Sequence, residues 1–133
     1  MPDVVVDAST LVNYLLDLLD PRLCGIIDDA RSHLHAPGCI EAETLHTLNK
    51  HRRYGGTDTD GFLSLSRDLA AAPIERHETP RLTAEAAALC GALSAYDAFY
   101  VALAQQLDAP LMTSDRRLVR AIRASIPGVK VIT

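Results

Sequence analysis

The sequence predicts an α/β protein in which helices cover both faces of a mainly parallel sheet. Segments with strand-like and helix-like hydrophobic patterns alternate along the chain, as expected of right-handed β-α-β crossovers. The first apolar run, Val4-Val5-Val6, is β-branched and ends directly in Asp7, which is typical of a buried parallel strand. With 133 residues, 48% hydrophobic and 23% charged, the chain suits one globular domain spanning residues 1–133.

Turn and capping residues set the expected limits of the elements in the first half. The expected order is strand 3–7, helix 9–19, a helix from Pro21 to about Arg31, strand 33–36, a helix from Pro37 to about Arg53 and a helix from about 58 to 71. Asp20-Pro21 starts the second helix, because proline is favoured in the first turn. Gly55-Gly56 ends the third helix.

The second half continues the alternation. We expect strand 74–77, helices 82–92 and 95–107, strand 110–113, helix 115–124 and strand 129–132. Gly91 to Ser94 separates the two successive helices, and Pro127-Gly128 precedes the last strand.

Four acidic residues form the candidate functional site, namely Asp7, Glu43, Asp97 and Asp115. Each lies where a strand ends or just inside a helix, and ligands of open α/β sheets bind at the carboxyl ends of the strands. Carboxylates within about 6 Å oppose one another's ionisation, so such a cluster takes up either protons or a cation. Oxygen ligands without a nearby Cys or His indicate Mg²⁺, with Mn²⁺ as a substitute.

Each acid also has a structural explanation. Asp7 and Asp115 lie where helix N-caps are wanted, and Asp is among the best N-caps. Ser94 and Asp97 form a capping-box pattern, and the helix dipole favours a negative charge there. Glu43 lies on a polar helix stripe that is either solvated or the wall of a cleft.

Basic residues flank the acids and indicate a nucleic-acid partner. Without the four candidate acids the formal net charge of -4 would be zero. No acid follows Asp115, whereas Arg116, Arg117, Arg120, Arg123 and Lys130 do. A second group is Lys50-His51-Arg52-Arg53. Basic residues are common at helix C-termini, but two groups beside an acidic site fit a phosphate groove better. Arg116, Arg117, Lys50 and Arg53 are therefore the candidate nucleic-acid-binding residues.

Other residue types exclude several classes of protein. Cys24, Cys39 and Cys90 are widely spaced without a C-x-x-C pair, so we interpret them as core residues. No apolar tract is long enough to span a bilayer, and we expect a cytoplasmic protein without a membrane partner. We interpret the histidines as surface or structural residues; they are His33, His35, His46, His51 and His77.

The helix expected at 9–19 is more apolar than packing on one sheet requires. The segment from Leu23 to Ile27 adds to its apolar surface, so an exposed apolar groove is expected. Alternatively, both helices pack on each other and on the sheet.

Four segments together resemble the motifs of a known family. They are Val5-Val6-Asp7-Ala8-Ser9, Pro37 with Glu43 six residues later, Ala95-Tyr96-Asp97-Ala98-Phe99-Tyr100-Val101-Ala102-Leu103-Ala104, and Leu111-Met112-Thr113-Ser114-Asp115-Arg116-Arg117-Leu118. In order and spacing they are similar to the four motifs of PIN-domain proteins, specifically the VapC-type toxins of type II toxin-antitoxin pairs. The resemblance covers the whole chain. His46 and Thr47 depart from it, since Asn and Ala are common there.

The resemblance implies a three-layer α/β/α PIN-like fold and a Mg²⁺-dependent endoribonuclease. Asp7, Asp97 and Asp115 would bind the metal, and Glu43 would complete the acidic pocket. Ser9 and Thr113 match hydroxyls that support the metal site. The resemblance also implies a homodimer and a small cognate antitoxin protein, whose C-terminal segment lies in an apolar groove.

Three other functions are compatible with such a fold. A phosphoacceptor receiver domain has paired acids after the first strand and a lysine after a late strand. Here Ala8 follows Asp7, and lysine occurs only at positions 50 and 130, which argues against it. A non-catalytic binding module, or a PIN-like nuclease that processes RNA outside a toxin-antitoxin pair, remains an alternative.

Overall fold

The structure is a computed structural model that describes residues 2–133. Its centre is a five-stranded sheet with the strand order β3-β2-β1-β4-β5. The strands are β1 (Asp3–Val6), β2 (His33–Pro37), β3 (Ile74–His77), β4 (Leu111–Met112) and β5 (Val131–Ile132). Every pairing between neighbouring strands is parallel, which confirms the predicted sheet.

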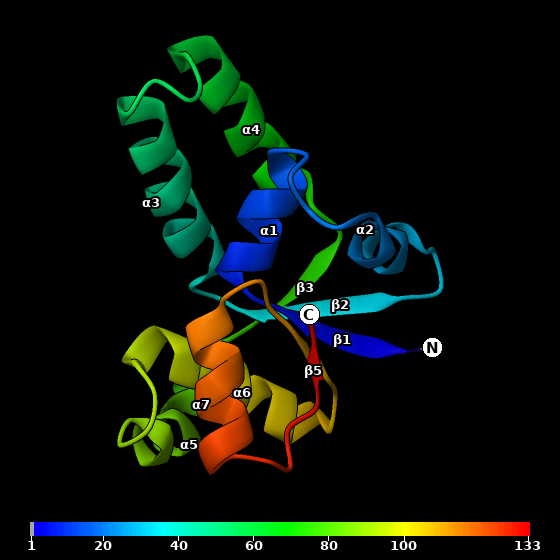
Figure 1. The fold of residues 1–133 in the computed structure, drawn as a ribbon, viewed down its shortest axis with the longest axis vertical. Helices are drawn as coiled ribbons and strands as arrows, with labels where there is room; N and C mark the ends of the chain where they lie inside the picture. Colours follow the sequence, from blue (N-terminus) through cyan, green and yellow to red (C-terminus); the bar gives the residue numbers. More distant parts are fainter. Residues whose placement is uncertain (1) are drawn as a thin grey trace.

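Helices cover the sheet on both sides. They are α1 (Ala8–Leu15), α2 (Pro21–Asp28), α3 (Ile40–Arg53), α4 (Thr59–Ala71), α5 (Thr83–Leu89), α6 (Ala95–Leu107) and α7 (Arg116–Ser125), with a short 3-10 helix, η1, at Thr79–Leu82. Figure 1 shows α1 to α4 on one side of the sheet and α5 to α7 on the other. This arrangement confirms the three-layer α/β/α fold.

β1 is the central strand because its side chains are buried on both faces. Val4 and Val6 alternate with Val5, and all three are buried. Val5 is in register with Leu111 on β4, which is also fully buried. α6 contacts β1, β2 and β4. The carboxyl end of β1 therefore lies between two buried layers, and this fixes where Asp7 lies.

The first helix is shorter than predicted. α1 ends at Leu15 rather than Leu19, because Asp17 adopts a left-handed conformation with φ 57° and turns the chain. Leu19 is buried after this turn, whereas Leu18 is 67% exposed. The predicted continuous apolar face is therefore wrong beyond Leu15.

The expected groove is also smaller than predicted. Leu11, Val12, Leu19 and Leu23 are buried, so much of this apolar surface packs internally, as in the alternative considered above.

The third helix begins later than predicted. Pro37 is the last residue of β2, in register with His77, and does not start the helix, which begins at Ile40. The amide of Gly38 donates to the carbonyl of His77 over 2.8 Å, so sheet-like pairing continues past Pro37. Proline is tolerated there because the sheet does not need its missing amide as a donor. The helix expected at 82–92 is α5, which ends at Leu89 and is preceded by η1.

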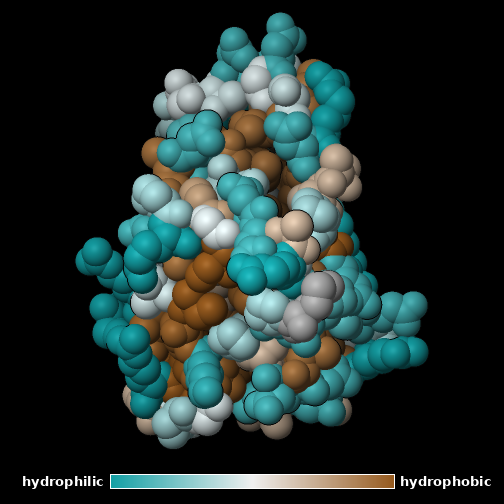
Figure 2. Space-filling view, turned by 90° about the vertical axis from the view of Figure 1, so that its right-hand side faces the viewer, coloured by the Kyte–Doolittle hydropathy of each residue, from teal (hydrophilic) through white to brown (hydrophobic). Residues whose placement is uncertain are grey.

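No helix within residues 2–133 is long and apolar enough to cross a membrane. Figure 2 views the side of the molecule that lies to the right in Figure 1. It shows hydrophobic side chains gathered most broadly in the lower left of the view, with hydrophilic side chains around them.

Candidate functional site

The four candidate acids come from four separate segments and line one pocket of about 340 Å³. Asp7 follows β1 and caps α1, Glu43 and Asp97 lie in the first turns of α3 and α6, and Asp115 caps α7. These positions place all four acids at the carboxyl edge of the parallel sheet, where ligands of open α/β sheets bind.

Asp7 is the most buried of these acids, with 4% of its surface exposed. Its Oδ1 atom accepts hydrogen bonds from the Ser9 hydroxyl (2.8 Å) and the Thr10 amide (2.9 Å). Its Oδ2 atom accepts a hydrogen bond from the Thr113 hydroxyl. Both carboxylate oxygens are therefore held in fixed positions.

Ser9 and Thr113 connect the two strand ends at the pocket. The Ser9 hydroxyl accepts a hydrogen bond from the Ser114 amide over 3.1 Å. The Thr113 hydroxyl accepts one from the Asp115 amide over 3.0 Å. Each hydroxyl thus binds Asp7 and the segment that carries Asp115. Their role in supporting a metal site stays a prediction.

The structural explanations for the acids also hold. Asp115 Oδ1 accepts hydrogen bonds from the amides of Arg117 (2.9 Å) and Leu118 (3.3 Å). The Ser94 hydroxyl accepts a hydrogen bond from the Asp97 amide over 3.3 Å, as in a capping box. Helix N-termini stabilise negative charge, so capping helps to concentrate carboxylates here.

Burial, with mutual repulsion in two cases, opposes ionisation of Glu43, Asp7 and Asp97. Burial, followed by the charges of Asp7 and Asp97, raises the pKa of Glu43 to about 7. Burial also raises the pKa of Asp7, although its hydrogen-bond donors act in the opposite direction. The pKa of Asp97 is raised by burial and then by the charges of Asp115 and Asp7. The pocket therefore favours binding of protons or a cation.

Three further residues belong to the pocket or its wall. Asn13 and Thr47 line the pocket. Asn13 lies one helical turn after Ser9 and interrupts an apolar stretch, which is the signal that could have identified it. Tyr100 is fully buried, and burial followed by the charge of Glu43 raises the pKa of its hydroxyl. Only the packed fold reveals that the Tyr100 hydroxyl is buried near Glu43.

Glu41 does not share the role of Glu43. Glu41 Oε1 forms an ion pair with Arg76 Nε at 2.7 Å, which connects α3 to β3. The Oε2 atoms of Glu41 and Glu43 are both buried without a hydrogen-bond partner among residues 2–133. Of the two glutamates, Glu43 is the one that lines the acidic pocket.

The candidate nucleic-acid-binding residues do not form one surface pocket. Arg116 and Arg117 are exposed on the first turn of α7, directly after Asp115. Lys50 and Arg53 line a different pocket of about 360 Å³ together with His46. The two pockets are neighbours along α3, because Thr47 lines the acidic pocket while His46 and Lys50 line the other one.

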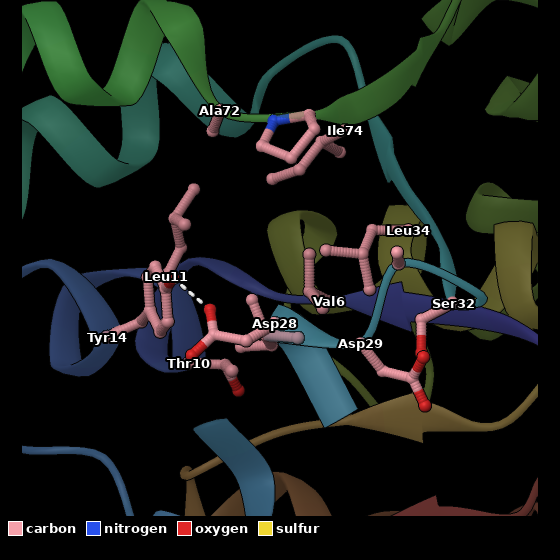
Figure 3. A pocket seen from close by; sticks show the side chains of 13 residues that line it. Val6, Thr10, Leu11, Tyr14, Asp28, Asp29, Ser32, Leu34, Ala72 and Ile74 are labelled. Atoms are coloured by element: carbon pink, nitrogen blue, oxygen red, sulfur yellow. Dashed lines mark hydrogen bonds between the residues drawn. The ribbon is translucent and has the colours of Figure 1, made fainter. Parts of the chain in front are cut away.

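A separate cavity of about 310 Å³ lies between α1, the end of α2 and the start of β3. Figure 3 shows Val6, Leu11, Leu34 and Ile74 around it, with a hydrogen bond from the Tyr14 hydroxyl to Asp28. Its lining, as far as residues 2–133 show, includes none of the four acids. The cavity lies on the face of the sheet opposite to the face that α6 covers.

The chain matches the PIN domain family over residues 4–123. It therefore belongs to the PIN-domain family, which agrees with the parallel sheet and the four converging acids. More particularly, it is similar to Ribonuclease VapC3 of Mycobacterium tuberculosis strain H37Rv. The two are 35% identical over 118 residues, which are 89% of this chain and 86% of that ribonuclease.

Solved structures share the fold at lower identity. The crystal structure of PAE2754 from Pyrobaculum aerophilum superposes with a TM-score of 0.72 at 21% identity, covering 98% of this chain and 83% of that one. VapBC2 from Rickettsia felis, crystallised bound to a promoter DNA fragment, gives a TM-score of 0.63 at 13% identity. That match covers 98% of this chain and 97% of the other.

Proposed function

We propose that this chain is a metal-dependent endoribonuclease of the VapC type and acts as the toxin of a toxin-antitoxin pair. The observation that carries the proposal is the convergence of Asp7, Glu43, Asp97 and Asp115 from four segments on one pocket. The ribonuclease activity named for its VapC relatives supports RNA as the substrate.

The pocket suits a divalent cation. Its donors are carboxylate oxygens, which Mg²⁺ and Mn²⁺ prefer. Glu43 Oε2 is buried with no partner among residues 2–133, and burial together with neighbouring carboxylates raises the pKa of Glu43 and Asp97. Asp7, Asp97 and Asp115 would hold Mg²⁺. When bound, the ion would lower the pKa of a water molecule and neutralise charge on the phosphodiester.

The residues of the chain supply orientation and proton transfer. Ser9, Thr10 and Thr113 fix both oxygens of Asp7, so its geometry needs no rearrangement. Without a bound ion, Glu43 takes up or releases a proton near neutral pH, because burial and the charges of Asp7 and Asp97 raise its pKa to about 7. Arg116 and Arg117 would contact the phosphate backbone, since guanidinium groups bind phosphate well.

The same proposal includes a small antitoxin protein and a homodimer. The solved VapBC2 assembly, whose toxin has this fold, supports an antitoxin partner. Leu18 is 67% exposed directly after α1 and provides an apolar contact for such a partner.

Cleavage of a labelled RNA by purified protein tests the proposal. Cleavage should require Mg²⁺, stop in EDTA and fall by about 100-fold or more in Asp7→Asn and Asp97→Asn, since each loses a charge at the reacting centre. Asp68→Asn is the matched control, because Asp68 is exposed on α4 outside the pocket. Undiminished cleavage in EDTA, or in both pocket variants, would contradict the proposal.

A further inference from the structure

Five side chains with metal-binding atoms meet on the sheet face opposite to the cavity of Figure 3. They are Asp3 on β1, His33 and His35 on β2, and Glu75 and His77 on β3. They alternate along their strands with Val4, Leu34 and Ile74, so the pleat directs them to one face. This cluster, as far as residues 2–133 show, shares no residue with the lining of the acidic pocket.

His35 is at the centre of this cluster. Its side chain is only 5% exposed, and both of its ring nitrogens face polar atoms. Nδ1 lies 2.9 Å from His77 Nε2 and 3.4 Å from Glu75 Oε2. Nε2 lies 2.8 Å from Asp3 Oδ1. Three strands thus contribute to the surroundings of a single buried imidazole.

Two imidazole nitrogens at this distance share one proton or both turn their lone pairs toward a cation. We propose that His35 Nδ1, Glu75 Oε2 and His77 Nε2 bind a divalent transition-metal ion of the Zn²⁺ class. These atoms lie within 4.8 Å of one another. The two separations from His35 are close to the edge of about 3.3 Å expected for a tetrahedral site with bonds of about 2.0–2.1 Å.

A second group that could hold a metal ion consists of Asp3, His33 and His35. The position of Asp3 instead favours His35, Glu75 and His77 as the ligands. A histidine ligand commonly donates its second ring N–H to a carboxylate, which fixes its tautomer and orientation. The Asp3 carboxylate occupies this position, with its Oδ1 atom 2.8 Å from His35 Nε2. His35 Nδ1 is then left with a lone pair directed toward Glu75 and His77.

The remaining donors agree with a nitrogen-rich site. His77 Nε2 lies beside His35 Nδ1, so the two imidazoles can direct one nitrogen each at the same ion. His33 Nε2 lies 2.9 Å from Glu75 Oε2 and His33 Nδ1 lies 3.3 Å from Asp3 Oδ1, so His33 is beside the site. Imidazole nitrogen with one carboxylate suits Zn²⁺, Co²⁺ or Ni²⁺, whereas the all-carboxylate pocket suits Mg²⁺.

An ion at this site would connect β2 to the edge strand β3, with β1 attached through Asp3. An ion that binds only the folded chain raises the free energy of unfolding as its concentration exceeds the dissociation constant. The site would therefore stabilise the sheet independently of the acidic pocket.

Titration of tag-free protein with Co²⁺ in saturating Mg²⁺ tests the proposal. We expect one Co²⁺ per chain with the visible absorption of a tetrahedral complex, displacement by Zn²⁺ and a higher melting temperature with Zn²⁺. Asp7→Asn should leave this binding unchanged, which separates the site from the acidic pocket. His46→Gln is the control for loss of a surface histidine, because His46 is exposed on α3.

Variants distinguish a metal site from a hydrogen-bonded network. Glu75→Gln and His77→Gln should remove the Co²⁺ spectrum, and Asp3→Asn should weaken binding by about 10- to 100-fold, as loss of a supporting carboxylate does. Circular dichroism of each variant shows whether it is folded. No absorption in the wild-type protein, or absorption retained in both folded ligand variants, would overturn the proposal.

Discussion

A buried carboxylate such as Asp7 keeps its charge only if donors or a cation compensate for the lost water. In this chain the hydroxyls of Ser9 and Thr113 are two of those donors. The Thr113 hydroxyl also accepts a hydrogen bond from the Asp115 amide. One hydroxyl thus contacts the Asp7 side chain and the Asp115 backbone. Its removal should affect both geometry and charge.

Thr113→Val should reduce RNA cleavage by about 10- to 100-fold, because residues that orient metal-site carboxylates commonly contribute this much. It should also lower the free energy of unfolding by about 1–3 kcal/mol, since Asp7 Oδ2 loses a buried donor. Single-turnover cleavage and urea denaturation measure the two effects.

Thr44→Val is the matched control for this prediction. Thr44 is equally buried, but its hydroxyl has no partner among residues 2–133. The same substitution should therefore leave cleavage and stability nearly unchanged or raise stability slightly. Equal losses in both variants would show that the Thr113 hydroxyl has no special role.

Glu43 should make the metal-free protein less stable as the pH rises. Its pKa is about 7 in the folded chain and 4.5 without the fold, so the folded state binds more protons between these values. This contribution is complete below about pH 4.5 and is lost as the pH rises through 7. The raised pKa values of Asp7 and Asp97 act in the same direction.

Unfolding free energies measured in EDTA from pH 5 to about pH 8 check this expectation. Glu43→Gln should reduce the decline, and Mg²⁺ should reverse it in the wild-type protein by stabilising the ionised acids. A wild-type stability that rises steadily with pH in EDTA would contradict the predicted sign.

At the residue level, the positions of Asp7, Asp97 and Asp115 after strands or at helix starts led us to expect that they converge. Spacing left the place of Glu43 open, and the family resemblance selected it. Tyr100 and His35 were different, because their significance depends on burial and on neighbours from distant segments. His33 and His35 alternate on one strand, and that spacing was the available signal for a shared face.

At the level of elements, the turn after α1 changes which leucines are available to a partner. Leu18 points outward and Leu19 points inward, although they are adjacent in an apolar stretch. A regular helix through residue 19 would have placed them differently. The left-handed Asp17 is the cause, and the hydrophobic pattern alone does not reveal it.

Leu19→Glu and Leu18→Glu should affect different properties, namely stability in the first case and antitoxin binding in the second. Leu19→Glu should cost at least about 3 kcal/mol, because it removes a buried apolar side chain and buries a charge. Leu18→Glu should leave stability within about 0.5 kcal/mol, as surface substitutions do, yet weaken the proposed antitoxin complex. Thermal denaturation and co-purification with the antitoxin measure these effects.

Equal destabilisation by the two substitutions would contradict the exposure difference. A complex that is unaffected by Leu18→Glu would exclude this residue from the antitoxin interface while leaving the nuclease proposal intact.

Element type was easier to predict than element limits. Apolar periodicity gave the alternation of strands and helices, because parallel strands need buried runs and crossover helices need one apolar face. The position of Pro37 was missed because proline suits both a helix start and a strand end that needs no amide donor. The pairing of Pro37 with His77 joins two segments that are distant in sequence, so the local pattern does not reveal it.

At the scale of the whole molecule, exposed basic residues lie beside the acidic pocket on α7 and further along α3. Arg116→Ala with Arg117→Ala should weaken binding of unrelated RNAs alike, because phosphate contacts carry affinity rather than sequence choice. If each arginine makes one contact, the salt dependence of log K should flatten by about 1.4. Filter binding at several salt concentrations measures the slope.

Arg22→Ala with Arg31→Ala is the charge-matched control. These arginines are exposed beside Asp20 and Asp29, outside the acidic pocket. Their removal should change the slope less. A selective loss for one RNA sequence, with the salt slope unchanged, would contradict phosphate binding by Arg116 and Arg117.

The hydrogen bond between Thr113 and Asp7 joins residues 106 positions apart. A ribosome adds about 5–20 residues per second, so roughly 5 to 20 seconds separate the synthesis of the two sides of the pocket. During that interval the nascent chain has Asp7 but neither β4 nor Asp115, and the pocket cannot close. The complete pocket, and any cleavage that depends on it, can therefore form only after β4 has left the ribosome.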